Sequence, residues 1–212
     1  PTILGAGMAE SRGVRHGYIT NQSEIVKSIR IALDQAEKVA KIKRRHENKP
    51  MLVVVSDAEM ALRYLEWSPK LQELADKYWF TRRSLLEADE GELGALTIVG
   101  RLKDLKTERL PRLADGVVAS DGTVAFRVTS NPLAARLSRE LGAPLVSTSA
   151  NIAGQGELYK IEEIIKMFEN QSDQPDIIID AGELPRRAPS TVVRVMSDKV
   201  KVLRQGEVVV AP

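Results

Sequence analysis

Cysteine is absent from this chain of 212 residues, and histidine occurs only at His16 and His46. Without a thiol the chain cannot form a disulfide, a thiolate metal site or a cysteine nucleophile. Two histidines are too few for a multi-histidine metal centre. We therefore expect no metal ion to be held by protein side chains alone, and the chemistry must come from other residue types.

Long apolar runs are also missing. No stretch of the sequence approaches the ~20 apolar residues that a membrane-spanning helix needs. The first residues lack the charged-then-apolar pattern of a signal peptide. The formal net charge is +2, which is too small to create a strong global field towards nucleic acid or a membrane surface. These features predict a cytoplasmic protein without a membrane partner.

The composition that remains is that of a globular domain. Hydrophobic residues make up 43% and charged residues 28% of the chain, which suits a protein with a full core. Residues 1–21 are rich in glycine and polar residues without a regular period, and we expect a loose N-terminal extension there. Residues 22–212 are expected to form a single domain.

Apolar periodicity predicts alternating helices and strands. Residues 22–45 have the strongest helical spacing, with a break possible near 34–35. The region 80–94 is charged and predicts an exposed excursion, and 101–122 a loop with a helical turn. The other expected helices cover 56–65, 68–78, 131–141 and 161–168; the expected strands cover 51–55, 95–99, 123–128 and 177–179, followed by a hairpin of 191–196 and 200–203. The predicted class is α/β, with a twisted open mixed sheet and flanking helices.

A dense polar stretch follows the apolar run 144–146, which reads as a short buried strand. Ser147, Thr148, Ser149 and Asn151 place three hydroxyls and an amide within five residues. A loop at the carboxyl edge of a sheet is where ligands bind in α/β proteins. Hydroxyls, an amide and backbone N–H groups suit phosphate or carboxylate oxygens. The alternative is a polar turn whose side chains satisfy their own backbone.

A basic run precedes the strand at 51–55. Lys43, Arg45 and Lys49 stand where the long helix is expected to end, before Pro50. Basic side chains in a last helical turn favour the helix dipole, which is one interpretation. Converging cations are also what a polyphosphate needs, so a phosphate clamp is the competing hypothesis.

Several of these stretches resemble motifs of one family, the YrdC-like threonylcarbamoyl-AMP synthases. The matches keep the family's order from about residue 36 to 206, some four-fifths of the chain. One motif alone would be weak, whereas five in order are specific. They are Lys43-Arg44-Arg45 with Lys49-Pro50, the strand 95–99, Arg127 with Asn131-Pro132, Pro144 to Asn151 with Gly154, and Pro189 to Val193 with Leu203-Arg204-Gln205-Gly206.

The resemblance implies an ATP-dependent synthase. Such an enzyme joins L-threonine, bicarbonate and ATP into threonylcarbamoyl-AMP and releases pyrophosphate, with Mg²⁺ bridging the phosphates. A threonylcarbamoyl transferase complex would then use the product for the t6A modification of tRNA. The implied fold is an open α/β sheet with a basic cleft.

The resemblance also implies roles for residues. Lys43 and Arg45 would be catalytic, clamping the triphosphate together with Lys49. Charge stabilisation and positioning would dominate catalysis, since negative charge gathers on phosphoryl oxygens. For Arg127 a cross-strand ion pair is an equally good interpretation. The other expected ATP- or substrate-binding residues are Ser147, Ser149, Asn151, Ser190 and Arg204.

Three positions depart from the family pattern. The P-T-x-T-x-Y-G-L motif of the threonine pocket is missing before the basic run, although 1–5 is a partial match ahead of the helix. The W-P-G-P turn is absent, and Ala153 replaces a serine. A degenerate paralogue, or a chain that rebuilds the missing strand from its N-terminus, would account for this. The alternatives are therefore a non-catalytic nucleotide- or RNA-binding module and a carbamoyl-adenylate-forming carbamoyltransferase domain.

A basic rim could bind tRNA, although a solvated surface is the other interpretation, given the small net charge. If tRNA binds there, its affinity is expected to fall steeply with salt. The rim comprises Arg82, Arg83, Arg101, Lys103, Lys106, Arg109 and Arg112.

Overall fold

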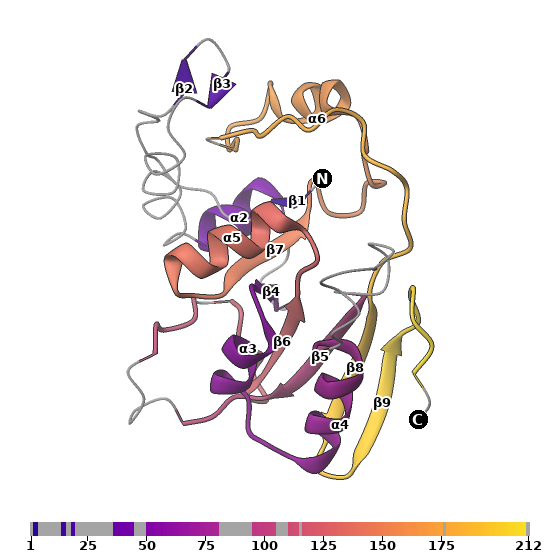
Figure 1. Ribbon diagram of the computed structural model, residues 1–212. Helices are drawn as coiled ribbons and strands as arrows, with labels where there is room; N and C mark the ends of the chain where they lie inside the picture. The colour runs from indigo at the N-terminus through magenta and orange to yellow at the C-terminus, as the bar shows by residue number, and fades with distance from the viewer. Residues whose placement is uncertain are drawn as a thin grey trace. The chain divides into compact units, whose positions relative to one another are not determined.

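The contacts of the chain group into two compact units. The first comprises Pro1–Met51, Ala114–Gly116 and Leu145–Arg186; the second comprises Leu52–Leu113, Val117–Pro144 and Arg187–Pro212. Figure 1 shows the computed structural model. It describes residues 2–3, 14–15, 18–19, 36–44, 50–80, 95–104, 110–114, 116–175 and 177–210. Most of the expected excursion at 80–94 lies outside these residues, as does the first part of the expected helix at 22–45.

The second unit is built on a mixed sheet with the strand order β4–β6–β5–β8–β9. The β4–β6 and β5–β8 pairs are parallel, whereas the β5–β6 and β8–β9 pairs are antiparallel. The mixed α/β class expected from the sequence is therefore confirmed. The strands are β4 (Leu52–Val55), β5 (Leu96–Arg101), β6 (Thr123–Val128), β8 (Thr191–Met196) and β9 (Lys199–Arg204).

The helices of this unit begin at polar caps. They are α3 (Ala58–Tyr64), α4 (Pro69–Tyr78) and α5 (Pro132–Leu141). Ser68 and Asn131 cap α4 and α5 by accepting from backbone N–H groups three residues ahead, as the sequence predicts. The helix expected from residue 56 begins two residues later, because Asp57 caps α3 by accepting from the Met60 N–H. The Ser56 hydroxyl donates to the Asp57 carboxylate.

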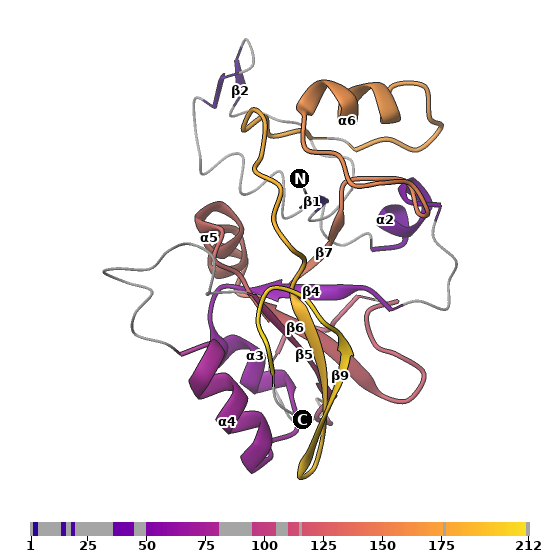
Figure 2. The same cartoon turned by 90° about the vertical axis from the view of Figure 1, so that its right-hand side faces the viewer.

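One face of this sheet is apolar and is covered by α3 and α4, as both views show (Figures 1 and 2). Phe126 meets Tyr64 of α3 with ring centroids 5.7 Å apart. The register aligns Val53, Phe126, Ile98 and Val193 in one row across the strands, and all are buried. Since side chains alternate along a strand, the next row, which contains Arg127 and Thr97, faces the opposite side. This sheet therefore has an apolar face and an opposite face on which polar side chains such as Arg127 and Thr97 stand among apolar ones such as Val54 and Val192.

A surface ion pair at the rim of the sheet supplies a pH-dependent contribution to stability. The Asp121 carboxylate accepts hydrogen bonds from the Thr123 hydroxyl at 2.6 Å and from Arg194 at 2.5 Å. The Thr123 hydrogen bond, followed by the Arg194 bond, lowers the pKa of Asp121 to about 2. Because the folded pKa lies below the unfolded value of about 3.9, this contribution is present above pH ~4 and is lost as pH falls towards 2.

We therefore predict that Asp121→Asn lowers the melting temperature at pH 6 but not at pH 2. Thermal melts of both proteins across this pH range test it. A difference between the two melting temperatures that stays constant with pH would contradict the prediction.

The first unit contains three short strands near the start of the chain. β1 (Thr2–Ile3) pairs antiparallel with β7 (Leu145–Ser149), and β2 (Val14–Arg15) pairs with β3 (Tyr18–Ile19). Six of the residues 1–21 therefore lie in paired strands, and the expectation of a loose extension stays a prediction for the remainder, which lies outside the described residues. β7 also extends three residues further than the sequence predicts, so Ser147, Thr148 and Ser149 lie within the strand and only the residues after them form the loop.

The described part of the first unit also contains two helices. α2 (Ala36–Ile42) ends where Arg44 takes a left-handed conformation, with φ 50, and Arg44 donates to Gln171 beyond α6 (Ile161–Phe168). Val39, Ile42, Ile164 and Phe168 are buried in this unit. The strand expected at 177–179 is wrong: these residues belong to no strand, and Ile178 is 45% exposed. In the described ranges no helix has the length and apolar character needed to cross a bilayer.

Candidate functional site

Lys43 follows the last turn of α2 and points at the end of β7. Its Nζ atom donates to the Ser149 carbonyl at 2.7 Å, the Asn151 carbonyl at 2.7 Å and the Asn151 Oδ1 atom at 2.8 Å. Lys43 is only 3% exposed, so the ammonium makes these bonds out of bulk water. Two motifs more than a hundred residues apart in sequence therefore converge, and we call Lys43, Ser149 and Asn151 the Lys43 cluster.

Further hydrogen bonds tie the cluster together. The Ser149 hydroxyl donates to Asn151 Oδ1 at 2.7 Å, and the Ala153 N–H donates to the Lys43 carbonyl at 2.8 Å. The Asn151 Nδ2 atom donates to the Gln155 carbonyl at 2.6 Å. Asn151 thus satisfies loop backbone groups, as the polar-turn interpretation of the sequence predicts. A ligand contact by this amide stays a prediction.

The geometry of Lys43 bears on the phosphate-clamp hypothesis. An ammonium has three protons, and three oxygen atoms of Ser149 and Asn151 lie within 2.8 Å of Nζ. In this arrangement Lys43 organises the loop, and a direct phosphate contact would require it to exchange one of these bonds. Arg45 and Lys49, the other clamp residues, lie outside the described residues, so their role stays a prediction.

Ser147 differs from its neighbours in the motif. Successive side chains alternate across a strand, so Ser147 and Ser149 share one face of β7. Ser147 is 7% exposed, and its hydroxyl makes no hydrogen bond to the described part of the chain. Among those residues it is therefore not tied to the loop as the Ser149 hydroxyl is, and a ligand contact by Ser147 stays a prediction.

This contrast gives a prediction that separates binding from folding. We expect Ser147→Ala to leave the melting temperature within about 2 °C while lowering turnover at least ~tenfold, equivalent to about 1.4 kcal/mol. We expect Asn151→Ala to lower the melting temperature, because it removes one of the three close oxygen partners of the Lys43 ammonium and the amide donor to the Gln155 carbonyl. Thermal melts and pyrophosphate release on both variants test this. Equal losses of stability in the two variants would contradict it.

A second group of polar residues lies at the start of β8 in the other unit. The Arg204 guanidinium donates from Nη2 to the Ser190 carbonyl at 2.7 Å and to the Ser190 hydroxyl at 3.2 Å, and its Nε donates to the same carbonyl at 3.2 Å. The Ser190 and Thr97 hydroxyls are 2.8 Å apart. We call Thr97, Ser190 and Arg204 the Ser190 cluster. The structure thus joins Ser190 with Arg204, as predicted, and adds Thr97, which sequence reasoning missed.

Arg127 belongs to the same face of the sheet. The register places Arg127 opposite Thr97, Thr97 opposite Val192, and Val192 opposite Arg204. The strand neighbours of Arg127 are Val54 and Thr97, so the register places no acidic residue directly opposite it, and its role stays a prediction.

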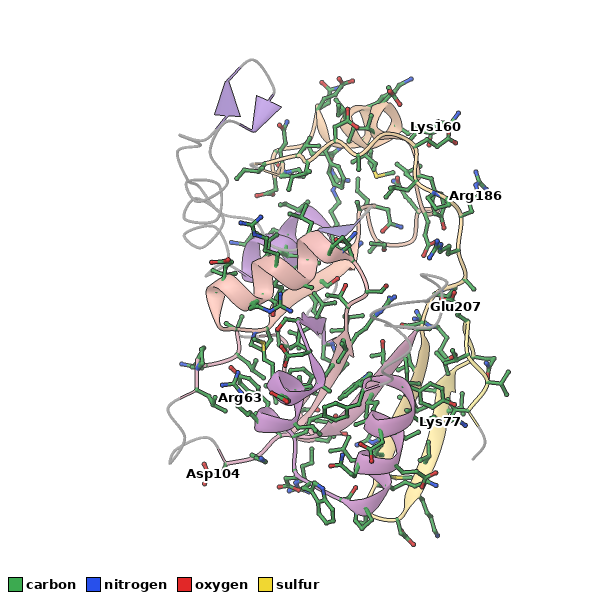
Figure 3. All side chains as sticks on the ribbon, viewed as in Figure 1. Arg63, Lys77, Asp104, Lys160, Arg186 and Glu207 are labelled. Carbon is green, nitrogen blue, oxygen red and sulfur yellow. The ribbon has the colours of Figure 1, made fainter. Side chains whose placement is uncertain are left out.

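Burial lowers the pKa of Arg127, Glu207 opposes this shift and the nearby charge of Arg204 adds to it. Glu207, labelled in Figure 3, lies beyond the end of β9 where its N–H donates to the Pro189 carbonyl at 3.0 Å. Two guanidinium groups and one carboxylate therefore sit within electrostatic range, an arrangement that favours an added anion. Glu207 carried no signal in the sequence beyond its place after the last motif.

Comparisons with known proteins agree with the motifs. A sequence model of the Sua5/YciO/YrdC family, described as telomere recombination, matches residues 32–206. A relative from Methanocaldococcus jannaschii with the provisional name threonylcarbamoyl-AMP synthase is 30% identical over 169 residues, covering 80% of this chain and 68% of that protein.

Solved structures share the fold. P. abyssi Sua5 complexed with L-threonine superposes with a TM-score of 0.61 at 23% identity, covering 80% of this chain and 44% of that one. E. coli YciO superposes with a TM-score of 0.62 at 24% identity, covering 82% of this chain and 74% of that one. This chain therefore spans less than half the length of P. abyssi Sua5. The family match runs through both compact units, so the two are parts of one family domain, and the chain belongs to the Sua5/YciO/YrdC family.

Proposed function

We propose that this chain is an L-threonylcarbamoyladenylate synthase, which condenses L-threonine, bicarbonate and ATP and releases pyrophosphate. The observation that carries the proposal is the convergence of Lys43 on Ser149 and Asn151, which joins two of the family's motifs at one point. The name of the M. jannaschii relative supports the reaction, and the L-threonine complex of P. abyssi Sua5 supports the amino-acid substrate.

The residues suit a reaction that needs positioning and charge stabilisation. The threonine nitrogen attacks the bicarbonate carbon, and a C–O bond of bicarbonate breaks with loss of water to give a carbamate. A carbamate oxygen then attacks the α-phosphate of ATP as pyrophosphate leaves. Ser147 would donate a hydrogen bond to a phosphate or carbamate oxygen, and Ser149, on the same face of β7, could do so by exchanging its bond to Asn151 Oδ1. Lys43 would hold these groups in place through its bonds to the loop.

The Ser190 cluster would bind a second anionic group. Arg204 is held at Nε and Nη2 by Ser190, and its Nη1 group makes no hydrogen bond to the described residues. An oxyanion can therefore approach an oriented guanidinium, which is the strong form of such a contact. Arg127, on the same face of the sheet, would add charge there.

Mg²⁺ is proposed to enter with ATP as part of the substrate. Phosphate oxygens are ligands that Mg²⁺ prefers, and it commonly needs few protein groups when phosphates are present. In the described ranges no three His, Asp or Glu side chains form a group that could hold a metal ion.

Threonine binding needs a substitute for the missing P-T-x-T-x-Y-G-L segment. The pairing of β1 with β7 places the backbone of Thr2 opposite Ser149 and that of Ile3 opposite Thr148. We propose that this N-terminal strand fills the place of the missing segment beside the Lys43 cluster. The alternative in which the missing strand is rebuilt from the N-terminus is thereby favoured over a degenerate paralogue.

Pyrophosphate release with different acceptors tests the proposal. We expect release that depends on L-threonine and bicarbonate together. Release that depends on carbamoyl phosphate would instead indicate a carbamoyltransferase domain. ATP binding without turnover would indicate a nucleotide-binding module. The downstream transferase complex and tRNA are proposed partners. An affinity for tRNA that does not change with salt concentration would exclude tRNA as a partner.

A further inference from the structure

Thr97 has a buried hydroxyl within the stretch 95–99, one of the five that resemble family motifs, but it was not among the expected site residues. Thr97 lies in β5 among apolar residues and is 1% exposed, and Ser190 at the start of β8 is 2% exposed. Their hydroxyl oxygens are 2.8 Å apart. Arg204 approaches the Ser190 hydroxyl from the other side, at 3.2 Å, and Arg204 is itself exposed.

The direction of the Thr97–Ser190 bond follows from where each proton can go. In the described part of the chain the Thr97 hydroxyl has only Ser190 Oγ as an acceptor. If Ser190 donated to Thr97 instead, the Thr97 proton would be buried without an acceptor, at the cost of an unmade hydrogen bond. If Thr97 donates, the proton left over is that of Ser190. Ser190 is the hydroxyl that neighbours the exposed guanidinium, so only at this end can the proton reach an incoming group.

We propose that Thr97 is a positioning residue that fixes the Ser190 hydroxyl as a donor to an oxyanion bound at Arg204. Thr97 and Arg204 both donate to Ser190 Oγ and so occupy its acceptor sites, which leaves the hydroxyl only its proton to offer. The ligand oxygen is therefore an acceptor, as in a phosphate or a carboxylate, and not a hydroxyl that must donate. The inference rests on the proposed function for the identity of that ligand but not for the bond itself.

Two substitutions isolate the hydroxyl of Thr97. Thr97→Val keeps the β-branched shape that suits a strand and removes only the donor, whereas Thr97→Ser keeps the donor. We expect Thr97→Val to raise the KM of the substrate bound at Arg204 roughly threefold to tenfold with little change in kcat, since a uniform binding contact is lost. Thr97→Ser is expected to have a KM close to that of the wild-type protein. An unchanged KM in Thr97→Val, or an equal loss in Thr97→Ser, would overturn the inference.

A double-mutant cycle shows whether Thr97 acts through Ser190. In a Ser190→Ala background, Thr97→Val is expected to have no further effect on anion binding, because the group it positions is gone. ATP and pyrophosphate are the probes, and calorimetry measures their affinity without turnover. Independent, additive losses would assign Thr97 a merely structural role and overturn the inference.

The same measurements separate failure of this inference from failure of the proposed function. If the protein turns over with threonine and Thr97→Val has an unchanged KM and anion affinity, the inference is wrong and the proposed function is supported. If the protein does not turn over but Thr97→Val binds pyrophosphate more weakly, the inference is supported and the proposed function is wrong. If neither anion binds the wild-type protein, the inference is wrong, since it requires an oxyanion at Arg204.

Discussion

Replacing Lys43 with methionine is expected to lower the free energy of unfolding by roughly 2–4 kcal/mol, and thereby the melting temperature by roughly 5–15 °C. Methionine keeps the apolar stem but removes the ammonium. The Ser149 and Asn151 backbone carbonyls and the Asn151 Oδ1 atom then lose a charged donor at 2.7 to 2.8 Å. The loop after β7 would lose its tie to α2, so pyrophosphate release is expected to fall more than ~tenfold as well.

Lys41→Met provides the matched control. Lys41 lies in the last turn of the same helix and is exposed, so the same chemical change there removes a solvated charge. We expect its melting temperature and turnover to stay near those of the wild-type protein. If Lys43→Met has the same melting temperature as Lys41→Met but a lower affinity for ATP, the phosphate-clamp hypothesis is supported and the loop-organising role is wrong.

The elements of the second unit were predictable because their signals are local. Continuous apolar runs predicted β4 and β5, alternation predicted β6, and caps such as Asn131 and the left-handed Gly142 bounded α5. The strand expected at 177–179 has the same apolar signal and failed. A strand needs a neighbouring strand for its backbone hydrogen bonds, and a run of isoleucines carries no information about that neighbour.

The site was predictable in part for the same reason. The motif around Ser149 and the basic run at Lys43 each suggested anion binding. Only the structure shows that Lys43 donates its hydrogen bonds to the loop itself. Thr97 was invisible because a threonine in an apolar strand is an ordinary β-former. Its role depends on Ser190, which comes from a strand 93 residues further along the chain. Long-range pairing, not composition, decides which polar residues meet.

Gly206 is the position where a single added methyl group should do most harm in the second unit. A Cβ atom there would lie 2.1 Å from the Pro189 carbonyl oxygen, 2.6 Å from the Ser190 carbonyl carbon and 2.6 Å from the Thr191 nitrogen. All three are backbone atoms, so no side chain can rotate away to relieve the contact. The Gly206 N–H also donates to the Thr191 hydroxyl at 2.9 Å. The segment after β9 can therefore pack against the start of β8 only if residue 206 has no side chain.

We predict that Gly206→Ala lowers the free energy of unfolding by roughly 1–3 kcal/mol, the usual cost of overpacking, and turnover at least ~tenfold. The clash must move either the start of β8 or the chain after β9. Ser190 directly precedes β8, whereas Arg204 ends β9, two residues before Gly206. Either shift would therefore move Ser190 and Arg204 apart. Gly156→Ala is the control, because a Cβ atom there meets nothing within 4 Å and the backbone φ is not left-handed. Thermal melts and ATP calorimetry on both variants check the prediction. Wild-type ATP affinity in Gly206→Ala would show that the Ser190 cluster tolerates the shift and would remove it from the binding site.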